Sequence, residues 1–222
     1  MNGEGCSDGV VLLHGIARTS RSLNKIERAL QGSRFTTLNL DYASRRKSLD
    51  ALAADIAPDI ARFAERTNGL IHFVGHSMGG LLIRIYLAKY RPARLGRVVM
   101  LGTPNGGSED RRPSAATCDL SDVLRPGRPA TIDATGSCVT SASAGGLRTR
   151  NRGGYWHDQP ISSFLILPRP NDGKVSAQRT MLDGMTDHTV VRASHPGLLR
   201  HPAAIGQTIA FLHEGRFLHA CA

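Results

Sequence analysis

The sequence predicts one α/β domain in which a mostly parallel sheet is doubly wound, with helices on both faces. Strand-like runs alternate with helix-like stretches along the first hundred residues, which is typical of βαβ units. The strand-like runs are continuously apolar, as expected for strands that are buried on both faces. A chain of 222 residues is long enough to bury one continuous core, so residues 1–222 are assigned to a single domain.

The first half of the chain contains four expected strands, each a short run rich in Val, Leu, Ile or Phe. They are residues 9–13, 35–40, 70–74 and 98–101. The intervening helices are expected at residues 20–30, 49–63 and 80–90, where apolar side chains recur at helical spacing. Pro58 is expected to kink or split the second helix.

The regular pattern stops in the middle of the chain. Residues 109–154 contain few large aliphatic side chains and show neither a helical nor an alternating period, so an irregular insertion is expected. Order is expected to resume with strands at 163–167 and 189–191 and a helix at 202–213. The abrupt loss and recovery of pattern suggests the hypothesis of a reading-frame disruption.

A nucleophile is predicted at Ser77. The sequence from Gly75 to Gly79 is GHSMG, a G-x-S-x-G motif between an expected buried strand and an expected helix. The glycines are needed because a Cβ beside such a tight, strained turn would collide with neighbouring backbone. The N–H groups at the start of the following helix favour negative charge at this point.

A serine hydroxyl needs a base, and three histidines of the C-terminal part compete for this role. His195 is favoured because it lies in the loop after the last expected strand, at the carboxyl edge of the sheet. His188 would lie at the start of that strand, and His201 would begin the final helix.

The carboxylate that orients the base is predicted to be Asp172. It lies in the turn Asn171-Asp172-Gly173, shortly after the expected strand at 163–167. The order Ser77, Asp172, His195 is the order of an α/β-hydrolase triad. Three other carboxylates are weaker candidates: Asp41, Asp183 and Asp187.

Two backbone N–H groups are expected to stabilise an oxyanion beside Ser77. We expect one from Met78 and the other from Ile16, because the loop after the first strand lets backbone approach the substrate. His14 and His76 lie next to these donors. Each either shapes the substrate pocket or makes a structural hydrogen bond.

With these residues in view, the sequence resembles the bacterial lipase-like α/β-hydrolases, in the group of small triacylglycerol lipases. The resemblance rests on VVLLHG, LNLDY, FVGHSMGG, LGTPNGG, NDGKVS and the final helix. It implies an α/β-hydrolase fold, the triad Ser77, Asp172 and His195, and hydrolysis of carboxylic esters without a cofactor or metal. The chain departs from that family at residues 109–157, where the irregular segment stands in place of the lid.

The expected activity is therefore a serine esterase or lipase that forms an acyl-enzyme on Ser77. The same residues would serve an acyltransferase or a thioesterase, and a catalytically impaired scaffold that binds a partner is a further alternative. The expected partner is a small-molecule ester or lipid, with contact to a membrane surface left open.

Charge and cysteine content give the remaining expectations. The formal net charge is +10, but the basic residues are spread along the chain without interleaved aromatic side chains, so no nucleic-acid partner is expected. The four cysteines show no metal-ligand spacing. With neither a secretory signal nor a transmembrane run, a cytoplasmic location is expected.

Overall fold

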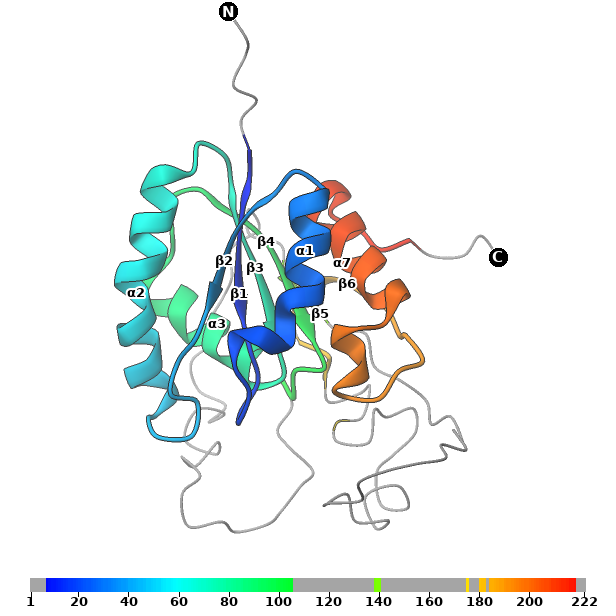
Figure 1. Ribbon diagram of the computed structural model, residues 1–222, viewed down its shortest axis with the longest axis horizontal. Helices are drawn as coiled ribbons and strands as arrows, with labels where there is room; N and C mark the ends of the chain where they lie inside the picture. The colour runs from blue at the N-terminus through cyan, green and yellow to red at the C-terminus, as the bar shows by residue number, and fades with distance from the viewer. Residues whose placement is uncertain (1–6, 106–137, 141–174, 176–179, 183, 219–222) are drawn as a thin grey trace, which may run out of the picture.

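The fold is a parallel sheet between two layers of helices (Figure 1). The computed structural model describes residues 7–105, 138–140, 175, 180–182 and 184–218. Within these ranges the strands are β1 (Gly9–Leu13), β2 (Thr36–Leu40), β3 (Ile71–His76), β4 (Leu95–Leu101), β5 (Cys138–Thr140) and β6 (Met185–His188). They form one sheet in the order β2-β1-β3-β4-β5-β6, and all neighbouring strands are parallel.

The helices cover the sheet in pairs. They are α1 (Asn24–Gly32), α2 (Leu49–Arg66), α3 (Met78–Tyr90) and α7 (Pro202–Glu214), with short 3-10 turns η1 (Ser20–Leu23) and η2 (Gly197–Leu199). Helices α1 and α7 lie on one face and α2 and α3 on the other (Figure 1). The predicted doubly wound parallel sheet, with helices on both faces, is confirmed.

The packing of strand β1 on both faces of the sheet explains why its sequence is continuously apolar. Val10 and Leu12 pack with α1 and α7, whereas Val11 and Leu13 pack with α2 and α3. All four side chains are fully buried, because a central strand of a doubly covered sheet has no solvent face.

Helix α2 runs through Pro58, so the expected split is wrong. Ala54, whose carbonyl loses its helical partner because residue 58 has no N–H, is exposed. Water can therefore bind that carbonyl. At the amino end of the helix, the Ser48 side chain accepts a hydrogen bond of 3.2 Å from the Ala51 N–H.

The second half of the sheet differs from the sequence-based expectation in two places. Strand β5 lies inside the segment expected to be irregular, and it pairs with β4 and β6. The last strand is Met185–His188, which ends just before the expected 189–191. The rest of residues 109–157, the expected strand at 163–167 and the reading-frame hypothesis concern residues outside the described ranges.

The strand order reverses between β1 and β3. The chain passes from β1 to β2 on one side and then returns to β3 on the other side of β1. Ligands of such sheets bind where the order reverses, at the carboxyl ends of the strands. Here those ends are followed by His14-Gly15-Ile16 and by Ser77-Met78. No helix within the described ranges combines the length and apolar character that a membrane span needs.

Candidate active site

Ser77 forms a strained turn between β3 and α3. Strand β3 ends at His76 and α3 begins at Met78, so Ser77 alone reverses the chain direction. Its φ of 54° and ψ of −120° lie in a region that side chains rarely adopt. The turn is held by a 2.9 Å hydrogen bond from Ser77 N–H to Leu101 O and a 3.1 Å bond from Gly80 N–H to Ser77 O.

The two glycines of the motif are required by backbone contacts. A Cβ on Gly75 would lie 2.6 Å from the Gly80 nitrogen. A Cβ on Gly79 would lie 2.1 Å from the Leu13 carbonyl oxygen. Both distances are far shorter than a van der Waals contact, so the collision expected from the motif is present in the structure.

The loop after β1 lies against Ser77. A Cβ on Gly15 would be only 3.3 Å from the Ser77 Cβ, which places the backbone of residue 15 beside the serine. Ile16 follows with 49% of its side chain exposed, and Ala17 has a positive φ of 56°. Among the described residues, no acceptor receives a hydrogen bond from the Ile16 or Met78 N–H groups.

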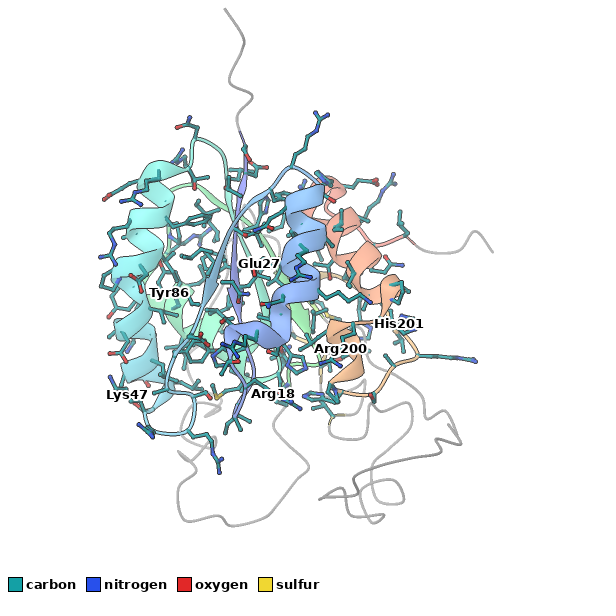
Figure 2. The ribbon with its side chains drawn as sticks, in the orientation of Figure 1. Arg18, Glu27, Lys47, Tyr86, Arg200 and His201 are labelled. Atoms are coloured by element: carbon teal, nitrogen blue, oxygen red, sulfur yellow. The ribbon has the colours of Figure 1, made fainter. Side chains whose placement is uncertain are left out.

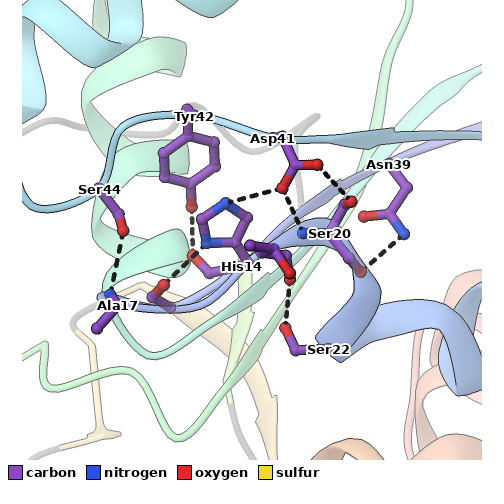
Figure 3. Close-up of polar contacts among 10 residues, drawn as sticks. His14, Ala17, Ser20, Ser22, Asn39, Asp41, Tyr42 and Ser44 are labelled. Atoms are coloured by element: carbon purple, nitrogen blue, oxygen red, sulfur yellow. Dashed lines mark hydrogen bonds and ion pairs between the residues drawn. The ribbon is translucent and has the colours of Figure 1, made fainter.

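His14 is buried under this loop and makes structural hydrogen bonds (Figure 3). Its Nδ1–H donates to the Gly15 carbonyl at 2.8 Å. Its ring stacks on Tyr42 with centroids 4.0 Å apart and planes 6° from parallel, and the Tyr42 hydroxyl donates to the His14 carbonyl. Burial lowers the pKa of His14, which favours the neutral ring. Burial also raises the pKa of Tyr42, so its hydroxyl stays a donor.

His76 connects the nucleophile turn to the loop that carries His195. The Nε2–H of His76 donates to the His195 carbonyl at 3.1 Å, and the two rings lie 4.7 Å apart. His195 is buried, with 5% exposure. The structure therefore brings His195 against the residue that immediately precedes Ser77.

The competing histidines have other partners. His188 is the last residue of β6 and not the first residue of a strand, which corrects the sequence-based placement. Its Nε2 is hydrogen-bonded to Thr180 Oγ1 at 3.1 Å, and burial lowers its pKa. His201 caps α7 as expected, because its Nδ1 accepts from the Ala203 N–H at 3.2 Å.

The predicted acid, Asp172, lies outside the described residues, as does the weaker candidate Asp183. Asp41 accepts hydrogen bonds from Ser20 N–H at 2.6 Å and Ser20 Oγ at 2.8 Å, and the backbone bond is the main cause of its lowered pKa. Asp187 accepts from the backbone N–H groups of His188 and Phe217 at 2.7 and 2.8 Å. These bonds give both carboxylates a role in holding loops together.

Exposed cations lie at the same end of the molecule. Figure 2 places Arg18 and Lys47 beyond the carboxyl ends of the strands. Lys47 is paired with Asp55 at 2.6 Å, whereas Arg18 belongs to the loop beside Ser77. In the described part of the chain, no group of three or more His, Cys, Asp or Glu side chains is arranged to hold a metal ion.

Comparison with known proteins identifies the family. The alpha/beta hydrolase fold family matches residues 9–137, which is more than half of the chain. The chain belongs to the alpha/beta hydrolase fold family. No curated protein matches its sequence at a significant level.

Solved structures show the same fold at low sequence identity. This alpha/beta hydrolase is 17% identical to the mature form of Bacillus licheniformis lipase BlEst2, with a TM-score of 0.65 and 88% of each chain covered. It is 16% identical to the lin2722 product of Listeria innocua, with a TM-score of 0.63 and 94% of each chain covered. A metagenomic carboxyl esterase, MGS0156, is 16% identical with a TM-score of 0.57, covering 86% of this chain and 65% of that one.

The sequence analysis did not single out two residues of this alpha/beta hydrolase, Tyr42 and Asn105, whose side chains make contacts at the carboxyl end of the sheet. Tyr42 was not singled out, although the fragment LNLDY contains it. Asn105 was also missed: it is buried after β4, donates to Thr180 O at 2.8 Å and accepts from Arg84 at 3.3 Å. Its position in the polar run after a buried strand is the signal that could have found it.

Proposed function

We propose that the protein is a serine hydrolase that cleaves carboxylic esters through an acyl-enzyme on Ser77. The observation that carries the proposal is the Ser77 turn, whose strained backbone is fixed by β4 and α3. Such strain is stored where a side chain must be presented to a ligand. The contact between His76 and His195 supports the assignment of His195 as the base.

In the proposed reaction, the Ser77 Oγ attacks the ester carbonyl carbon while His195 takes the hydroxyl proton. The negative charge that develops on the carbonyl oxygen is stabilised by the N–H groups of Ile16 and Met78. When the carbon–oxygen bond of the ester breaks, His195 returns the proton to the leaving alcohol. Water then attacks the acyl group with the help of His195, which releases the acid and restores Ser77.

Asp172 is proposed to orient His195, from the order of the motifs along the chain. The proposed substrate class is a small ester or a lipid, and this chemistry needs no cofactor. The names of two structural neighbours, a lipase and a carboxyl esterase, support an ester substrate. An acyltransferase or a thioesterase would use the same residues, and product analysis with ester, thioester and alcohol acceptors distinguishes these reactions.

A fluorophosphonate probe tests the proposal, because it reacts covalently with an activated serine. The folded wild-type protein should be labelled on Ser77 and should hydrolyse a p-nitrophenyl ester, and Ser77→Ala should do neither. Ser33→Ala is the matched control: Ser33 lies at the end of α1 and only caps Ala29 O at 3.0 Å. Absence of labelling in folded wild-type protein would refute the enzyme and favour a binding scaffold.

A further inference from the structure

The orientation of the peptide group between Gly15 and Ile16 is fixed by hydrogen bonds to its carbonyl oxygen. In a trans peptide the carbonyl oxygen and the N–H point to opposite sides of the chain. The Gly15 carbonyl accepts a hydrogen bond from His14 Nδ1–H at 2.8 Å and a weaker one from Arg18 N–H at 3.3 Å. These bonds therefore also determine where the Ile16 N–H points.

The imidazole of His14 can hold this carbonyl only in one tautomer and one orientation. With the proton on Nδ1, the ring donates to the Gly15 carbonyl. With the proton on Nε2 alone, two lone pairs would face each other. The Nε2 atom is buried, has no hydrogen-bond partner among the described residues and lies 3.8 Å from Asp41 Oδ1, too far for a hydrogen bond.

Tyr42 fixes the imidazole through a stacked ring and a hydroxyl. Its ring lies flat on the His14 ring, and its hydroxyl donates to the carbonyl of the same residue (Figure 3). One side chain therefore restrains both the ring and the main chain of His14. Tyr42 comes from the segment after β2, so this restraint reaches the site from outside the nucleophile motif.

The loop needs these restraints because its backbone is strained. Ala17 has a φ of 56°, and its N–H is held by Ser44 Oγ at 3.1 Å. Farther along, Ser20 is held by two bonds to Asp41. Hydrogen bonds therefore hold the loop at Ala17 and Ser20. The bond from His14 fixes the Gly15–Ile16 peptide, which comes before these two residues in the chain and lies beside Ser77.

We propose that His14 and Tyr42 are positioning residues that hold the Gly15–Ile16 peptide with the Ile16 N–H directed to the oxyanion, an inference that rests on the function proposed above. Loss of the His14 donor leaves the Gly15 carbonyl with only the weaker bond from the Arg18 N–H, and the peptide can then rotate. Rotation would turn an oxyanion donor away and present an oxygen in its place.

A pair of His14 variants tests the donor. Asn carries an N–H donor at the position of Nδ1, whereas Leu has the same branching without a donor. His14→Leu should lower kcat by about 100-fold with KM changed less than about threefold, since one oxyanion donor is lost. His14→Asn should recover activity to within about tenfold of wild type. Equal kcat in the two variants would overturn the proposal.

The control for loss of a buried imidazole is His72→Leu. His72 is fully buried and accepts a 2.7 Å bond from Arg97 N–H. It lies near the amino end of β3, whereas Ser77 follows the carboxyl end of that strand. This variant should lose stability without a change in kcat. Tyr42→Phe keeps the stacked ring but loses the hydroxyl, and should lower kcat by about tenfold or less, the value of one hydrogen bond.

A measurement without catalysis separates this inference from the proposed function. In protein labelled with ¹⁵N-isoleucine, the Ile16 amide resonance should differ between His14→Asn and His14→Leu, because both lack the ring and only one keeps the donor. The resonance of Ile60, buried in α2, should coincide in both variants. Coincident Ile16 resonances would overturn the positioning role even if Ser77 reacts with the probe. An unreactive Ser77 would overturn the proposed function instead.

Discussion

Gly79→Ala should break the turn that presents Ser77. The new Cβ would lie 2.1 Å from Leu13 O and 2.7 Å from His14 O. Leu13 is paired in register with Leu40 of β2 and Gly75 of β3, so these carbonyls cannot retreat without disturbing both ladders. We expect a loss of about 3 kcal/mol, because overpacking against fixed backbone outweighs the gain of about 1 kcal/mol in helix propensity.

Gly206→Ala is the matched control within a helix. Gly206 lies in α7, is exposed and has no atom within 4 Å of the position that a Cβ would occupy. The same substitution should therefore stabilise the protein by about 0.5–1 kcal/mol. Urea unfolding followed by circular dichroism measures both variants, and probe labelling reports Ser77. Gly79→Ala with wild-type stability and wild-type labelling would refute the steric argument.

Helix α2, the buried histidines and the competing bases each give a further prediction. Pro58→Ala should raise the free energy of unfolding by about 1–3 kcal/mol in urea titrations, since it restores a helical hydrogen bond; a lower value would contradict this. Burial lowers the pKa of His14, His72 and His188, so the unfolded chain binds more protons below pH 6.5. Stability should therefore be complete above that pH and should fall as the pH drops below 6.5. Urea midpoints measured at several pH values would show this decline, and a midpoint that stays constant would contradict it. His195→Ala should lower kcat by about 10⁴-fold, and His188→Ala by less than about tenfold; the opposite order would assign the base to His188.

The first half of the fold was predictable because its central strands are buried on both faces. The runs of β1 and β3 contain few polar residues, and the helices between them show regular apolar spacing. Strand β5 is only three residues long, so it gives no run to detect. Strand β6 has the sequence MTDH, which is less apolar than the Thr189–Val191 stretch that was mistaken for it.

The candidate site was predictable where one local motif carries the geometry. The Ser77 turn follows from glycines two residues away on either side, which the motif itself displays. The stacking of Tyr42 on His14 joins residues 28 apart, and no spacing rule relates them. Contacts of this kind arise from strand order, because β2 and β1 are neighbours in the sheet.

The Ser77 amide is bonded to β4, and this attachment has a consequence for hydrogen exchange. Its N–H donates to Leu101 O, and Leu101 is the register partner of His76 in the centre of the sheet. Opening that bond requires separation of two central strands, which are the last elements of such a domain to open. The Ser77 amide should therefore exchange with deuterium only when the whole domain unfolds. Thermal unfolding would then disrupt the nucleophile turn and the sheet in a single transition.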